Sequence, residues 1–271
     1  MSRTVEIVAT AFICLCALGC QRDVRPGEPA RTAETVSGAA VEQSRGDKAG
    51  AAPGDCSALP SDDVLKKLVR QVPAEAPVGG MFDGRMEWVA VVNRRGEICA
   101  ATVSTDEPAS SWQGSAAIAK AKAYTANAFS TDTQPVSTAR LYTLAQPGHS
   151  LYGAANGNPF DPACLDTPKG ALDAGKGHVC GGTIVFGGGV PLYQGKTRVG
   201  GLGASGDTAC ADHEIAKRIR HAAQLDPEKG ANVDDIVYTK ADGPSMYAHP
   251  LCANTWRNGQ KLGDEALPTT Y

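Results

Sequence analysis

Several kinds of residue are scarce in this sequence of 271 residues, and each shortage excludes a class of function. Aromatic residues make up only 6%, which argues against a surface that stacks nucleic-acid bases. Lysine and arginine (26) do not exceed aspartate and glutamate (29), so the net charge of −3 argues against a general polyanion binder. The cysteines form no CxxC or CxxCH motif, which excludes a zinc ribbon, a thioredoxin-like motif and covalent c-type haem attachment.

No apolar run is long enough to span a bilayer, but the N-terminus carries a short one. Residues 7–18 are apolar and follow Arg3, as in the hydrophobic region of a secretory signal. The run ends at Ala17-Leu18-Gly19-Cys20, which resembles a bacterial lipobox. We therefore expect residues 1–19 to be a lipoprotein signal peptide and Cys20 to be lipidated, with plain secretion as the alternative. Gln21 after the cysteine indicates an outer-membrane lipoprotein that faces the periplasm.

The segment after Cys20 has the composition of a tether. Residues 21–54 contain no leucine, isoleucine or aromatic residue, so they cannot bury enough apolar surface to offset the entropy of ordering. We expect residues 20–54 to be a flexible tether and residues 55–271 to form a single domain with a C-terminal extension.

Six of the nine cysteines lie in that domain. An even number favours disulfides in an oxidising compartment, but six cysteines allow fifteen different pairings. One expected pair flanks a loop rich in glycine, proline and aspartate, a second ties a helix to the C-terminal tail, and the third is what remains. These pairs are Cys164–Cys180, Cys210–Cys252 and Cys56–Cys99.

The periodicity of the domain is that of an α/β protein. Helices are predicted from Ser61 to Pro73, over residues 113–129 and over residues 208–224. Strands are predicted over residues 86–93, 97–104, 183–186, 190–194 and 197–204, with a strand-like patch at 236–239. The stretch 130–182 is long and irregular, which indicates a functional or crosslinked segment.

Two motifs resemble nucleotide sites, and their context argues against both. Residues 201–206 match GxGxxG, but the preceding strand belongs to a hairpin and not to a parallel βαβ unit. Gly195-Lys196-Thr197 ends like a Walker motif, but Val190 stands where the motif requires glycine.

The histidines are the candidate ligand residues. Adjacent helical residues point about 100° apart, so Asp212, His213 and Glu214 cannot converge on one metal ion. His213 lies off the apolar face of its predicted helix and is expected to face solvent, with a pocket or a subunit interface as alternatives. His149 and His178 lie in the long irregular stretch, where ligand-binding groups are common, and neutral imidazole is a common ligand of haem iron. No catalytic constellation is evident, which favours a protein that is not an enzyme.

Four segments together resemble a known family. They are residues 88–97, 119–129, 186–193 and 199–212, and their order is similar to that of the GlcG/HbpS-like (DUF336-type) haem-binding family, which is sometimes labelled haem-degrading. The resemblance covers about residues 78–224, and the cysteine at 210 resembles a secreted lipoprotein subgroup. It implies an antiparallel sheet of about five strands flanked by helices, symmetric homo-oligomers, and a structural role for the GxGxxG run. Asn93 stands where the family usually has aspartate.

The resemblance implies a lipid-anchored, extracytoplasmic protein that binds haem or a related tetrapyrrole for storage, sensing or sequestration. The candidate cofactor-binding residues are His213, His178 and His149, with Gly187, Gly188 and Gly189 shaping the pocket walls. The alternatives are a haem-degrading or small-metabolite enzyme, and an oligomeric interaction module without a small ligand. The expected contacts are haem, further copies of the chain and a membrane through the lipid anchor alone, with no nucleic acid.

Overall fold

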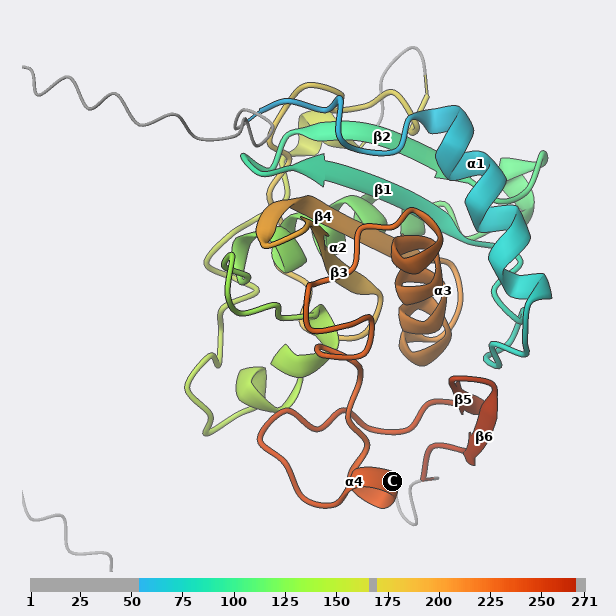
Figure 1. The fold of residues 1–271 in the computed structure, drawn as a ribbon, viewed down its shortest axis with the longest axis vertical. Helices are drawn as coiled ribbons and strands as arrows, with labels where there is room; N and C mark the ends of the chain where they lie inside the picture. The colour runs from blue at the N-terminus through green and yellow to red at the C-terminus, as the bar shows by residue number, and fades with distance from the viewer. Residues whose placement is uncertain (1–53, 166–169, 267–271) are drawn as a thin grey trace, which may run out of the picture. The chain divides into compact units, whose positions relative to one another are not determined.

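A four-stranded antiparallel sheet forms the centre of the domain (Figure 1). The structure is a computed structural model that describes residues 54–165 and 170–266. The predicted signal peptide, the lipobox with Cys20 and all but the last residue of the tether lie outside these residues. None of the described helices is both long enough and apolar enough to cross a membrane.

The sheet consists of two hairpins placed side by side. Strands β1 (Trp88–Asn93) and β2 (Ile98–Val103) form one, and β3 (Gly189–Gln194) and β4 (Thr197–Ser205) form the other. The order is β2-β1-β4-β3, and each neighbouring pair is antiparallel. The predicted antiparallel arrangement is confirmed. A separate two-stranded sheet joins β5 (Thr255–Arg257) to β6 (Gln260–Gly263).

Two predicted strands are wrong, because other groups take up their backbone hydrogen bonds. In residues 183–186, the Ile184 amide donates to the Thr125 hydroxyl at 3.0 Å, and that hydroxyl lies 3.3 Å from the Gly182 carbonyl. In residues 236–239, Val237 makes only an isolated bridge with Ala248, and the short helix α4 (Thr239–Asp242) begins directly afterwards.

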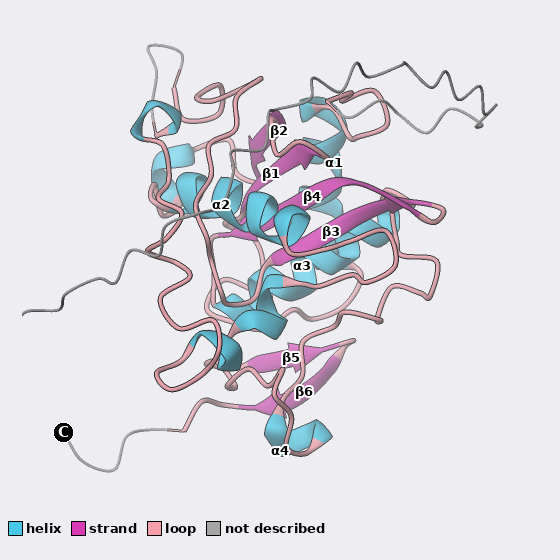
Figure 2. Cartoon of the chain, turned by 90° about the vertical axis from the view of Figure 1, so that its left-hand side faces the viewer, coloured by secondary structure: helices cyan, strands magenta, loops and turns pink. Residues whose placement is uncertain are grey.

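Helices cover both faces of the sheet, as Figure 2 shows. Helices α1 (Asp62–Gln71) and α3 (Ala209–Ala222) pack on one face, and α2 (Ser115–Ala128) packs on the other. Successive residues of a strand point to opposite faces, so Val89 and Val91 of β1 join the α1 and α3 side while Trp88 and Ala90 join the α2 side. Short 3₁₀ helices occupy Val72–Ala74, Pro108–Ser110, Thr138–Leu141, Thr143–Ala145 and Pro162–Cys164.

Three disulfides fasten the segments outside the sheet, and they are the three expected pairs. Cys56–Cys99 joins the start of the domain to β2. Cys164–Cys180 closes a short loop, and on the entropic model this crosslink stabilises the fold by about 3 kcal/mol. Cys210–Cys252 ties α3 to residues 235–266, the C-terminal segment that carries β5 and β6. The buried Lys120 amine of α2 further anchors the irregular stretch, because it donates to the carbonyls of Cys164, Ala171 and Ala174.

The GxGxxG run lets β4 lie close to α2. A Cβ on Gly203 would overlap the Ala119 carbonyl oxygen, and a Cβ on Gly201 would overlap the Ala123 carbonyl oxygen. The glycines therefore serve packing between a strand and a helix, as the family resemblance implies.

We expect Gly203→Ala to lower the free energy of unfolding by about 1–3 kcal/mol, because the added methyl group forces β4 and α2 apart. Chemical denaturation would measure the change. Gly157→Ala is the matched control, since a Cβ there would meet only the Ala154 carbonyl at 3.7 Å. Equal stabilities of the two variants would contradict the packing role of Gly203.

Candidate functional site

The structure does not bring the three predicted histidines together. His149 and His178 are exposed residues of the irregular stretch. His213 lies on α3 and is 1% exposed, so the expectation that it faces solvent is wrong. The cause is the C-terminal segment: Asp235 Oδ1 lies 3.2 Å from His213 Nε2 and covers that side of the helix. His213 Nδ1 has no hydrogen-bond partner in the described part of the chain.

Gly187 of the predicted glycine run lies close to His213 and to a fourth histidine, His249. The Gly187 amide donates to His249 Nε2 at 3.3 Å, and a Cβ on Gly187 would lie 3.2 Å from the His213 Cβ. All three glycines from Gly187 to Gly189 are buried. Gly187 therefore lies beside two buried histidines that belong to distant parts of the sequence.

His249 is held as one tautomer by the backbone. Its Nδ1 lies 2.7 Å from the Pro250 carbonyl, which can only accept, so Nδ1 carries the proton and Nε2 carries the lone pair. Burial lowers the pKa of His249 from about 6.5 to about 4, so the ring is neutral at pH 7. The sequence does hold a signal for this residue, because His249 and His213 each lie three positions from a cysteine of one expected disulfide.

His249 lines a cavity of about 680 Å³ between the irregular stretch and the C-terminal segment. The Tyr142 ring lies 4.9 Å from the His249 ring, and the Tyr238 ring lies 6.5 Å away on an edge-to-face contact. The Tyr238 hydroxyl is buried without a hydrogen-bond partner among the described residues, and burial raises its pKa, so it stays protonated. The remaining lining residues are Thr143, Thr239, Lys240, Ala248, Pro250, Leu251, Asp264, Glu265 and Ala266.

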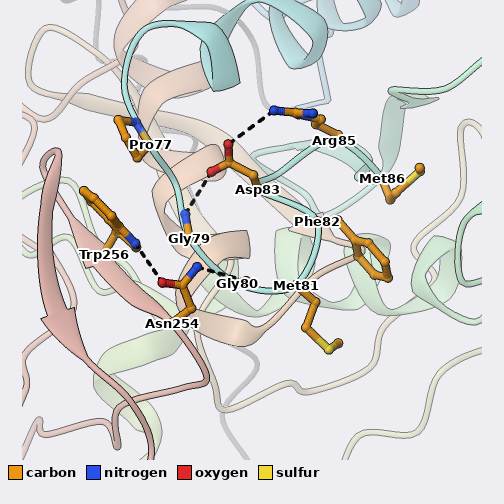
Figure 3. A pocket seen from close by; sticks show the side chains of 10 residues that line it. All are labelled: Pro77, Gly79, Gly80, Met81, Phe82, Asp83, Arg85, Met86, Asn254 and Trp256. Carbon is orange, nitrogen blue, oxygen red and sulfur yellow. Dashed lines mark hydrogen bonds and ion pairs between the residues drawn. The ribbon is translucent and has the colours of Figure 1, made fainter.

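A second cavity, of about 580 Å³, opens beside the loop before β1 (Figure 3). The Asp207 carboxylate shapes this loop by accepting the amides of Met81 at 2.7 Å and Phe82 at 2.8 Å. Across the cavity, Asn254 accepts from the Trp256 indole and donates to the Gly80 carbonyl. The cavity offers apolar side chains but contains no histidine.

Buried charges lie behind the glycine run. The Lys122 amine of α2 is 2.6 Å from Asp212 Oδ2 and 3.0 Å from the Ala204 carbonyl, with both charged side chains buried. Glu87 is also fully buried, and neither of its carboxylate oxygens has a partner in the described chain. Burial, reinforced by the charge of Asp212, raises the pKa of Glu87 well above its ordinary value.

A second charged group lines the covered side of α3. Lys217 contacts Glu214 and Asp235, each at 2.8 Å. Burial acts to raise the pKa of Asp235, but the neighbouring His213 and Lys217 outweigh burial and hold that pKa well below its usual range. These charges are paired within the fold, so they position α3 and the C-terminal segment.

Comparison with solved structures finds chains of low identity. The Klebsiella pneumoniae protein ORFY is 22% identical, with a TM-score of 0.41, and the match covers 59% of this chain and 85% of that one. A PduOC–haem complex is 22% identical, with a TM-score of 0.43 and coverage of 62% and 97%. A double mutant of Streptomyces reticuli HbpS is 20% identical, with a TM-score of 0.36 and coverage of 69% and 97%. No curated protein matches the sequence.

A family model described as "Haem degrading protein HbpS-like" matches residues 83–220. The match runs from the loop before β1 almost to the end of α3, so it contains the four-stranded sheet, α2 and the glycine run. It spans half of the chain and leaves α1 and the C-terminal segment with His249 outside. The chain belongs to the HbpS-like haem-degrading protein family.

Proposed function

We propose that this protein binds haem or a related tetrapyrrole in the cavity beside His249. The observation that carries the proposal is His249 itself, a buried imidazole on a cavity wall whose Nδ1–H is held by a backbone carbonyl. Histidines that bind metals usually donate their second nitrogen in this way, and neutral imidazole is a common axial ligand of haem iron.

The residues around the cavity fit such a ligand. Tyr142 supplies a half-buried aromatic ring beside that of His249, and the fully buried Tyr238 ring supports His249 from behind with an edge-to-face contact. Lys240 on the same lining offers a cation for a carboxylate of the tetrapyrrole. Iron ligation by His249 would replace the Gly187 contact, which at 3.3 Å is long for a hydrogen bond and contributes about 1 kcal/mol.

The location and role are part of the same proposal. The lipobox-like sequence at Cys20 supports an anchor in the outer membrane on the periplasmic side. Three disulfides in the described chain agree with an oxidising compartment. In that setting the protein would store, sense or sequester haem, and further copies of the chain would be its partners.

We expect the purified chain to give a saturable change in Soret absorbance when it is titrated with haemin. His249→Ala should weaken binding by more than about 10-fold, since even the loss of an outer-shell partner commonly costs that much. His149→Ala and His178→Ala are matched controls on exposed loops, and they should bind as the wild type does. Circular dichroism should show that all variants are folded.

Two results would contradict this assignment. Unchanged binding by folded His249→Ala would remove His249 as the ligand, and loss of binding in a control variant would place the ligand in the irregular stretch. The absence of any saturable binding by the folded wild type would overturn the haem proposal itself.

An interaction module remains the second candidate function, because one observation favours it. Met81 is 56% exposed, Trp112 is 47% exposed, and Phe82 contacts the Trp112 ring at 5.4 Å. Exposed apolar side chains that gather in this way are typical of contact surfaces. Two results together would support this function instead. The folded wild type would bind no haem, and its oligomer would dissociate in the Phe82→Ser variant.

A further inference from the structure

The Cys210–Cys252 disulfide and His249 form a cluster of metal-ligating atom types. The two sulfurs and one imidazole nitrogen all lie within 4.8 Å of one another, and all three residues are buried. No other group of three such residues in the described chain has this geometry. In the oxidised protein the two sulfurs are bonded to each other, so the cluster holds a disulfide and not a metal ion.

The chemistry of the cluster changes when that bond is reduced. Two cysteine thiolates and one neutral imidazole are the donors that Zn²⁺ prefers, and three protein ligands leave one coordination position open. The spacing repeats on the two segments: Cys210 precedes His213 by three residues on α3, and His249 precedes Cys252 by three. Helical residues three apart share one face, so His213 lies on the same side of α3 as Cys210.

An independent observation also indicates a missing ligand. His213 Nδ1 is buried and lacks a hydrogen-bond partner in the part of the chain that is described. The Gly187 backbone links it to the cluster, because this residue packs on His213 and donates to His249 Nε2. A buried nitrogen without a partner is costly, so its presence next to this cluster's own Gly187 contact calls for an explanation such as a bound ion.

The two cysteines are held close together by more than their own bond. The Cys210 amide donates to Cys252 Sγ at 3.2 Å. The Thr255 hydroxyl accepts from the Cys252 amide and donates to the Cys252 carbonyl, both at 2.7 Å. These contacts keep the turn around Cys252 in place, so the sulfurs stay near His249 after the disulfide opens.

We propose that reduction of Cys210–Cys252 by a dithiol creates a binding site for Zn²⁺, with Cys210, Cys252 and His249 as its ligands. The dithiol gives two electrons and two protons to the disulfide and becomes a disulfide itself. The ion then displaces the two thiol protons and forms two metal–thiolate bonds. This site shares His249 with the proposed haem function, but the two can fail separately, because the metal site exists only in the reduced protein and is measured without haem.

The test is a metal titration of the full chain in two redox states. The protein is reduced with dithiothreitol, freed of reductant under argon and titrated with Co²⁺, whose thiolate charge-transfer absorption reports cysteine ligation. Zn²⁺ is then added to displace Co²⁺. We expect one ion per reduced chain, displacement of Co²⁺ by Zn²⁺, and no thiolate–metal absorption in the oxidised chain.

Three variants assign the ligands. Cys210→Ser/Cys252→Ser should abolish the charge-transfer band, and His249→Ala should weaken binding by more than about 10-fold. Cys164→Ser/Cys180→Ser is the matched control, because it removes a buried disulfide that belongs to no such cluster, and it should bind Co²⁺ as the wild type does.

Near-ultraviolet circular dichroism shows whether the reduced chain keeps its tertiary structure, which decides how each titration result is interpreted. A reduced chain that stays folded and binds no ion would overturn the proposal, and so would undiminished binding by Cys210→Ser/Cys252→Ser. If reduction removes the tertiary signal, its recovery on addition of Zn²⁺ in the control variant supports the site. A failure to recover counts against it.

Discussion

Lys122→Met is expected to lower the free energy of unfolding by about 3–5 kcal/mol, because it leaves the buried Asp212 carboxylate without its cation. The Lys122 amine is fully buried and lies 2.6 Å from Asp212 Oδ2, and it is also the nearby positive charge that favours ionised Glu87. Removal of the amine therefore leaves two carboxyl groups in a space that water does not reach. Urea denaturation followed by circular dichroism would measure the loss.

Two further variants separate the buried charge from other effects of the change. Lys196→Met removes a lysine of an exposed pair with Glu228 at 3.5 Å, and it should change stability by no more than about 0.5 kcal/mol. Lys122→Met/Asp212→Asn should recover much of the loss, because an asparagine oxygen can still accept the amides of Gly206 and Asp207. A loss in Lys122→Met no larger than that in Lys196→Met would show that the buried pair contributes little.

We also expect His249 by itself to contribute a loss of about 3 kcal/mol of stability as the pH falls from 6.5 to 4. The folded pKa of His249 lies near 4, whereas the unfolded chain takes up a proton near 6.5. Between these values the unfolded state binds more protons, so acid favours unfolding. The contribution is therefore fully present above pH 6.5 and is lost as the pH falls toward 4.

The measurement is the free energy of unfolding at several pH values for the wild type and for His249→Gln. The variant should lack this part of the pH dependence, and His149→Gln, which removes an exposed imidazole, should retain it. Asp235 contributes at more acidic pH, because its pKa is lowered. Glu87, whose pKa is raised, contributes with the opposite sign in this range, so the difference between the wild type and His249→Gln isolates the part that belongs to His249. A wild-type dependence that persists in His249→Gln would show that another group titrates in this range.

The secondary structure could be predicted because its signals are local. A run of aromatic and β-branched residues, buried along its whole length, defines β1, and an apolar stripe defines α1 with Ser61 as its cap. These elements follow from residues that are neighbours in the sequence. The strand prediction for residues 183–186 is wrong for the opposite reason. The Thr125 hydroxyl that accepts the Ile184 amide lies about sixty residues earlier in the sequence.

The candidate site could be predicted only in part. The sequence predicts Gly187 as a site residue, and in the structure it lies close to His213 and His249. The sequence predicts His149 and His178 as ligands because they lie in a long loop, but loop position does not determine whether a side chain faces a cavity or solvent. The sequence predicts His213 at the surface, because no local signal shows that the C-terminal segment folds back over α3.

Periodicity and motif order thus suffice to predict the family, the antiparallel sheet and the main helices. The three disulfides follow from where the six cysteines stand relative to the predicted loop, helix and tail, and not from their number. Tertiary structure alone decided which groups meet: Lys122 with Asp212, ninety residues apart, and His249 with Gly187, sixty-two residues apart. Such contacts depend on how the chain returns to itself, because the burial and charge of a side chain come from neighbours that are distant in sequence.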